Sequence, residues 1–328
     1  AGQTHRNVAE QWPQLYRKWV HDPFSIQIPG GESPAGLRTR SLASLRDVLS
    51  RHHDGDTIAL VSHQVVARTL VCSLVGAPDH VYWLVHQDLC NMSRFRSNMA
   101  RNAFTLVRMN ETCHLSPALP NAGSGTRLLL VRHGQTAWNQ GAGEERFRGR
   151  TDLPLDETGQ SQSLALANRL GGEQATALYA SPLLRTRQTL VPLSTELNLP
   201  VQTHDGLIDI HYGRFQGLAH SRAATAFPHQ YGLWRDRPSQ VQFPEGERLA
   251  DVQTRLRALL EEMASRHPGE TVVLAGHQIV NKVLVCTLLG LDLDQVWRVE
   301  QDTCGIDVFQ QLAGQWHTLR LNDVCHLG

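Results

Sequence analysis

The chain has 328 residues, of which 41% are hydrophobic and 19% charged, as is usual for a globular protein that buries a sizeable core. Its 31 basic and 31 acidic residues give a formal net charge of zero, which excludes the broad positive surface of a nonspecific nucleic-acid or acidic-membrane binder. No apolar run approaches the roughly 18–20 residues of a membrane helix. An anionic substrate must therefore be attracted by a local cluster of positive groups.

An internal repeat organises the chain. Residues 29–115 correspond to residues 244–327, since TIALVSHQ at 57–64 matches TVVLAGHQ at 271–278 and both copies end in Cys-His-Leu. The two segments are therefore homologous copies of one fold. The first copy has no counterpart of residues 127–215, so it lacks a strand that would be central to its sheet. We favour a fragment of a longer two-domain protein; the alternative is a remnant that packs on its neighbour or pairs with another chain.

Between the copies, residues 116–126 are rich in Pro, Gly and Ser and predict an exposed linker. We therefore divide the chain into a partial repeat over 1–115, this linker, and a complete domain over 127–328. No cysteines form a CxxC pair, so we expect no structural zinc site. We expect buried free thiols in a cytoplasmic protein, with disulfides within each copy as the less favoured alternative. The cysteines occupy equivalent places in the two copies, Cys72 with Cys286, Cys90 with Cys304, and Cys113 with Cys325.

The first strand of the complete copy is predicted at 128–131, a continuous apolar run that ends at Arg132-His133-Gly134. Residues 271–274 predict a second buried strand, which also leads to a histidine, His277. In α/β sheets, chemistry gathers beyond the carboxyl ends of the strands. We therefore expect His133 and His277 to share a site.

Helices are predicted on either side of these strands. Residues 157–170 have helical composition with few breakers. Apolar residues at helical spacing predict a second helix over 249–266 with one buried face. Strands that alternate with helices in this way indicate a layered α/β fold.

A series of short motifs accompanies Arg132-His133-Gly134. In chain order they are RHGQTAWN at 132–139, DLPL at 152–155, SPLLRTRQT at 181–189, DIHYG at 209–213, GE at 246–247 and GHQ at 276–278. Together they resemble the histidine phosphatase superfamily, the group of phosphoglycerate mutase and its phosphatase relatives, over nearly all of 127–328. The resemblance implies a three-layer α/β/α sandwich, here preceded by an N-terminal partial repeat of the same fold.

The resemblance also implies roles for particular residues. It makes His133 the histidine that becomes phosphorylated, places Arg132, Arg185 and His277 in the phosphate pocket, and offers Asn139 as a further polar phosphate contact. Guanidinium groups fit this role because their planar forks match phosphoryl oxygens. A neutral His133 could attack phosphorus and form a phosphohistidine that water hydrolyses. The arginines supply the positive charge, so we expect no metal and no other cofactor.

The proton donor for the leaving group is open between two carboxylates. The family motif usually has Glu where this chain has Asp209, four residues before Gly213. We favour Asp209 as the general acid, with a helix cap or a surface carboxylate as its alternative role. Glu247 matches a family position near the pocket, and its alternative role is an acidic residue at the start of the following helix, favoured by the helix dipole.

The reaction is predicted from the spacing of these carboxylates. Asp209 and Glu247 lie 38 positions apart, whereas the mutases of the family carry a long insertion there. We therefore favour hydrolysis of a small-molecule phosphomonoester, with mutase-type transfer or a non-catalytic phospholigand-binding or dimerisation module as alternatives. Neither nucleic acid nor membrane is an expected partner, and a homodimer is left open. The loops over 211–245 carry aromatic residues that would either contact the leaving group or lie in the core, namely Tyr212, Phe215, Phe227, Tyr231 and Trp234.

Overall fold

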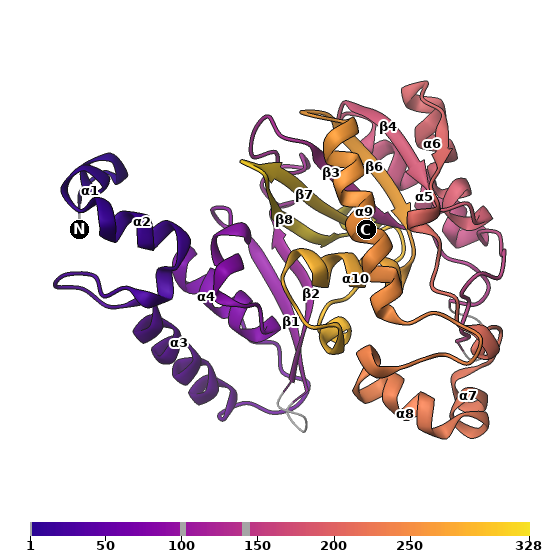
Figure 1. Cartoon of the computed structure of the whole chain (residues 1–328), viewed down its shortest axis with the longest axis horizontal. Helices are drawn as coiled ribbons and strands as arrows, with labels where there is room; N and C mark the ends of the chain where they lie inside the picture. The colour runs from indigo at the N-terminus through magenta and orange to yellow at the C-terminus, as the bar shows by residue number, and fades with distance from the viewer. Residues whose placement is uncertain (1, 99–102, 140–144) are drawn as a thin grey trace.

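The computed structural model describes residues 2–98, 103–139 and 145–328. Within these ranges, eight strands form one sheet in the order β1-β2-β8-β7-β3-β6-β4-β5, flanked by helices (Figure 1). The strands are β1 (Met92–Asn98), β2 (Ala103–Glu111), β3 (Arg127–Arg132), β4 (Ala175–Ala180), β5 (Val201–Thr203), β6 (Thr271–Gly276), β7 (Ile306–Leu312) and β8 (Gln315–Asp323). Strands β3, β6, β4 and β5 are parallel, and β7 and β8 are antiparallel to their neighbours.

Helices cover both faces of the sheet, which explains why every residue of β3 is buried. Leu128 and Leu130 pack in the cluster that contains the apolar residues of α9 and α10, whereas Leu129 and Val131 pack in the cluster of α5 and α6. The helices of the complete copy are α5 (Glu157–Leu170), α6 (Leu184–Leu197), α7 (His220–Ala226), α8 (Pro228–Asp236), α9 (Leu249–Arg266) and α10 (Gln278–Leu288). The α/β fold and the predicted helices over 157–170 and 249–266 are confirmed.

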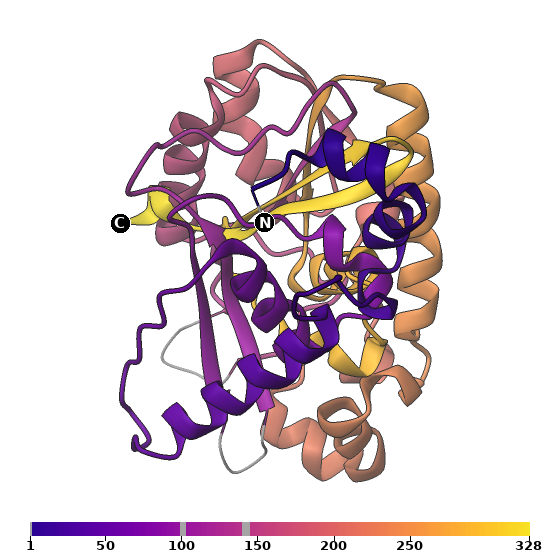
Figure 2. The same cartoon turned by 90° about the vertical axis from the view of Figure 1, so that its left-hand side faces the viewer.

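The first copy is the indigo and purple part of Figure 1, and it extends the same sheet through β1 and β2. Its helices are α1 (His5–Gln11), α2 (Pro13–His21), α3 (Pro34–Leu49) and α4 (Gln64–Val75). Figure 2 shows this copy from the front. Residues 57–62, which correspond to β6, form no strand, and Leu60 and Val61 are 50% and 99% exposed. They lack a neighbouring strand because residues 1–115 contain no counterpart of β3 or β4.

The two copies meet across an approximate twofold axis between β2 and β8, which pair antiparallel. The Asn110 side chain donates to the Leu319 carbonyl at 2.6 Å, and the equivalent Asn322 donates to the Val107 carbonyl at 2.8 Å. Both asparagines have left-handed backbone conformations, with φ of 58° and 56°. Equivalent residues therefore make equivalent contacts on either side of the axis.

The segment over 116–126 is irregular and mostly exposed, as predicted for a linker, but it is not free. Leu119 is buried, and its backbone N–H donates to the Glu173 carboxylate at 3.0 Å. The side chain of Gln310 on β7 donates to the Gly123 carbonyl at 2.6 Å. These contacts fix the segment against the complete copy.

A disulfide joins Cys113 to Cys325, the equivalent cysteines of the two copies, 212 positions apart. The expectation of free thiols is wrong for this pair, because the twofold arrangement brings the ends of β2 and β8 together. The cysteines therefore no longer favour the cytoplasmic expectation. The remaining cysteines are free thiols, Cys72, Cys286 and Cys304 buried and Cys90 exposed. Among the described residues, no helix is both long and apolar enough to cross a membrane.

Candidate active site

The two motif histidines lie side by side, with ring centroids 5.3 Å apart. Parallel pairing places Arg132 at the end of β3 opposite Gly276 at the end of β6, so the residues that follow share one edge of the sheet. Both rings are buried. The expectation that His133 and His277 lie together is therefore met by the fold itself.

The His133 ring is fixed by a hydrogen bond of 2.7 Å between Nδ1 and the Gly134 carbonyl. A carbonyl can only accept, so Nδ1 carries the proton and Nε2 keeps its lone pair. Burial lowers the pKa of His133 well below its ordinary value, and the positive charges of Arg185 and Arg132 lower it further. A neutral imidazole with a free Nε2 is the form required of a nucleophile.

Arg132 and Arg185 bring two guanidinium groups to the same place. Arg132 Nη1 donates to the Gln301 carbonyl at 2.7 Å, and Arg185 Nη2 donates to the Gly149 carbonyl at 2.8 Å. The Nε atom of each arginine is buried without a hydrogen-bond partner among the described residues. A buried donor without a partner is costly, and an anion bound here would satisfy both.

His277 is the third group of this kind. Both of its ring nitrogens are buried without a hydrogen bond to the described residues. Burial, followed by the charge of Arg185, lowers the pKa of His277 well below its ordinary value. A phosphate dianion beside the ring would favour the protonated form, because an opposite charge raises the pKa of a histidine.

Asp209 lies directly against this cluster. Its Oδ2 atom is 3.0 Å from Arg185 Nη2 and 3.7 Å from His277 Nδ1, and its Oδ1 atom accepts from the Ile210 N–H at 2.9 Å. Burial raises the pKa of Asp209 above its ordinary value, although the neighbouring Arg185 opposes the shift. A carboxyl group that holds its proton at higher pH suits the donor role.

Glu247 has different partners. Its carboxylate accepts from the His211 N–H at 2.8 Å and pairs with Arg150 at 3.0 Å and Arg255 at 3.6 Å. These contacts tie Glu247 to the loop that follows Asp209. The structure thus joins Asp209, and not Glu247, to the arginine and histidine of the candidate phosphate pocket.

Asn139 closes the turn that follows His133. Its side-chain oxygen accepts from the Thr136 N–H at 2.9 Å and from the Thr136 hydroxyl at 2.8 Å. These bonds hold the turn in shape. A phosphate contact by the Asn139 amide group stays a prediction.

A pocket of about 140 Å³ opens over His133 and Asp209, whereas Arg132, Arg185 and His277 are not among the residues that line it. Arg148 lines it, is 7% exposed, and pairs with Glu145 at 3.6 Å. Sequence reasoning missed Arg148, although three arginines within five residues at 146–150 form the local positive cluster that a neutral chain requires. Aromatic residues form much of the wall, and of the expected set the pocket includes Tyr212 and Trp234, together with Phe147 and Trp297.

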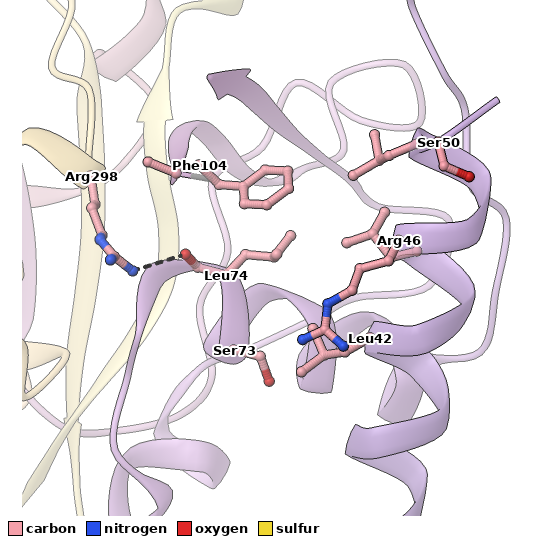
Figure 3. A pocket seen from close by; sticks show the side chains of 10 residues that line it. Leu42, Arg46, Ser50, Ser73, Leu74, Phe104 and Arg298 are labelled. Atoms are coloured by element: carbon pink, nitrogen blue, oxygen red, sulfur yellow. Dashed lines mark hydrogen bonds between the residues drawn. The ribbon is translucent and has the colours of Figure 1, made fainter. Parts of the chain in front are cut away.

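A larger pocket of about 310 Å³ lies in the first copy, between α3, α4 and β2 (Figure 3). Leucines such as Leu42 and Leu45 line it, and neither His133 nor Asp209 does. Among the described residues, one group of potential metal ligands lies close enough together to bind an ion, Cys113, Asp323 and Cys325. Its two sulfurs form the disulfide, and Asp323 pairs with Arg320 at 2.8 Å.

Comparison with known proteins agrees with the geometry. The histidine phosphatase superfamily (branch 1) matches residues 1–112 and 128–324, which confirms both copies of the repeat. The chain is 34% identical over 202 residues to phosphoserine phosphatase 1 of Hydrogenobacter thermophilus, covering 62% of this chain and 94% of that protein. It is 31% identical over 198 residues to glucosyl-3-phosphoglycerate phosphatase of Mycobacterium tuberculosis, covering 58% of this chain and 86% of that protein.

Solved structures point the same way. The YhfR structure from Bacillus stearothermophilus superimposes with a TM-score of 0.59 at 28% identity, covering 62% of this chain and all of that one. A buried, neutral histidine between two arginines, in this fold and with phosphatase relatives, leads to one conclusion. The chain belongs to the histidine phosphatase superfamily and is a phosphatase.

Proposed function

We propose that this phosphatase hydrolyses small phosphomonoesters through a phosphohistidine on His133, without a metal. The observation that carries the proposal is the set of buried donors left unpaired around the nucleophile, on Arg132, Arg185 and His277. A phosphoryl group has three equatorial oxygens that these donors can bind. Their positive charge supports the transition state, so the proposed reaction needs no metal ion.

In the first step, Nε2 of His133 attacks phosphorus in line with the ester oxygen. The phosphorus–nitrogen bond forms as the bond to the leaving oxygen breaks, and Asp209 gives that oxygen its proton. In the second step, ionised Asp209 takes a proton from water, whose oxygen attacks phosphorus and releases phosphate and free His133. Asp209 thus acts first as an acid and then as a base.

Two observations favour hydrolysis over mutase-type transfer. The first is the short separation of 38 positions between Asp209 and Glu247. The second is that the relatives named above are a phosphoserine phosphatase and a glucosyl-3-phosphoglycerate phosphatase. We also propose that the chain divides into a partial copy over 1–115, a connecting segment over 116–126 and a complete copy over 127–328.

The test is an assay of the purified chain on p-nitrophenyl phosphate, phosphoserine and a panel of sugar phosphates in EDTA, beside His133→Ala. We expect phosphate release that persists in EDTA and vanishes in the variant. Acid-labile labelling of the protein by a ³²P-ester, absent in His133→Ala, would identify the intermediate. Equal activity in the variant would refute the nucleophile, and phosphate binding without turnover would favour a binding module.

A further inference from the structure

We propose that the first copy positions the phosphate pocket of the second. Its strand β2 and helix α4 bind residues 293–301, the segment that contributes Trp297 to the wall of the pocket and orients Arg132 through Gln301. This inference rests on the proposed function, because it takes Arg132 as a phosphate ligand. It gives residues 1–115, which contain no Arg-His-Gly strand, a part in the reaction of the second copy.

The segment contacts the site at two of its residues. Trp297 lines the pocket and packs on Trp234, with ring centroids 4.9 Å apart. At the end of the segment, the Gln301 carbonyl accepts from Arg132 Nη1 at 2.7 Å. A shift of this segment would move both the pocket wall and the guanidinium group that faces the phosphate.

Strand β2 of the first copy binds residues 299 and 300 of the segment through the backbone. The Glu300 N–H donates to the Leu106 carbonyl at 2.9 Å, and Leu106 forms a parallel bridge with Val299. Both side chains of that bridge are 2% exposed, so they pack in the core. The Thr105 hydroxyl adds a bond of 3.4 Å to the Trp297 carbonyl.

The carboxyl end of α4 accepts hydrogen bonds from two further side chains of the segment. Arg298 Nη1 donates to the Leu74 carbonyl at 3.4 Å, as Figure 3 shows, and Gln295 Nε2 donates to the Val75 carbonyl at 3.3 Å. The last carbonyls of a helix have no partner within it, so side chains from the second copy satisfy them here. Two separate elements of the first copy therefore bind the same nine-residue stretch.

A side-chain ion pair completes the contact, between Arg96 on β1 and Glu300. Glu300 directly precedes Gln301, whose side chain donates to Asp307 on β7 at 2.8 Å and 3.0 Å. Gln301 is thus fixed from its own domain on one side and through Glu300 from the first copy on the other. The position of the Arg132 acceptor depends on both copies.

The test compares Leu106→Ala with a matched control, Leu45→Ala. Both remove the same atoms from a buried leucine of the first copy, but Leu45 lies on α3 and, although it lines the pocket of Figure 3 together with Arg298, it takes no part in the bridge between β2 and residues 299–300. Inhibition by inorganic phosphate and by vanadate, KM and kcat are measured for each folded variant. We expect Leu106→Ala to raise both inhibition constants by about two- to tenfold, as for one weakened hydrogen bond, and Leu45→Ala to leave them unchanged.

A second pair of variants changes exposed side chains, and so disturbs the core less than Leu106→Ala. Arg96→Met removes the ion pair with Glu300, whereas Arg94→Met changes an exposed arginine of the same strand for which the described residues provide no ion pair. We expect Arg96→Met to raise the phosphate inhibition constant less than Leu106→Ala does, and Arg94→Met to leave it unchanged. Leu106→Ile should recover most of the phosphate affinity that Leu106→Ala loses. Unchanged inhibition constants in both Leu106→Ala and Arg96→Met would overturn the proposal.

The inference and the proposed function fail in different ways. If the wild type shows no turnover, calorimetry can still measure phosphate affinity in Leu106→Ala and Leu45→Ala. A loss of affinity in Leu106→Ala alone supports the inference. If the wild type neither turns over esters nor binds phosphate, both are overturned. Turnover with equal constants in all variants leaves the proposed function standing and removes the positioning role.

Discussion

Asp209→Asn separates the chemistry of the leaving group from the binding of the phosphoryl group. The substitution removes the ionisable proton and the charge but keeps the shape and one side-chain oxygen. That oxygen can still accept from Arg185, which is 3.0 Å away in the native protein. Arg185 also keeps its bonds of 2.8 Å to the carbonyls of Thr151 and Gly149. Arg185 nevertheless loses its buried counter-charge, and the Ile210 N–H loses a carboxylate acceptor, so we expect a loss of folding stability of up to about 3–5 kcal/mol.

The expected loss of activity depends on the ester. A positioned general acid contributes typically about 10²–10⁴-fold, equivalent to about 3–5 kcal/mol of barrier. An alkyl phosphate such as phosphoserine expels a strongly basic alkoxide and should lose this full amount in kcat/KM. p-Nitrophenyl phosphate expels a stable phenolate that needs little protonation, so it should lose much less.

The affinity for phosphate should not fall with the activity. The native carboxylate, when ionised, repels an anion bound to Arg185, so Asp209→Asn should leave the phosphate inhibition constant unchanged or lower it. The assay is steady-state kinetics on both esters with phosphate as inhibitor, beside Glu247→Gln as the control. Equal losses for the alkyl and aryl esters would refute the acid role, and a selective alkyl loss in Glu247→Gln alone would transfer that role to Glu247.

Two further predictions concern the pH dependence of the reaction and the disulfide between the copies. Burial raises the pKa of Asp209 above its ordinary value and lowers that of His133 below its own, so the acid keeps its proton to a higher pH, and the nucleophile becomes neutral at a lower pH, than the free side chains would. Alkyl ester hydrolysis should thus fall as pH rises through the raised Asp209 pKa, a limb that pH–rate profiles should find missing in Asp209→Asn. Cys113→Ser opens a link between positions 212 apart and should lower the free energy of unfolding by about 2–4 kcal/mol in urea titrations, with kcat retained. An unchanged urea midpoint under non-reducing conditions would count against the disulfide.

The main strands and helices of the complete copy can be predicted from the amino-acid sequence alone. Its buried strand before His133 and its helices over 157–170 and 249–266 are local patterns, in which hydrophobic spacing and breakers specify the element. The two histidines could be placed together because parallel strands end at the same edge of a sheet. The order of the motifs then indicated the family, which the comparisons confirm.

The tertiary structure decided what depends on neighbours distant in sequence. Residues 57–62 align with β6 and share its apolar run, yet they form no strand, because a strand needs partners for its backbone hydrogen bonds. The pairing of Cys113 with Cys325 follows from the twofold arrangement of β2 and β8, which cysteine spacing cannot reveal. The ion pairs of Glu247 and the backbone contacts of Leu106 with residues 299 and 300 likewise form only when segments distant in sequence meet.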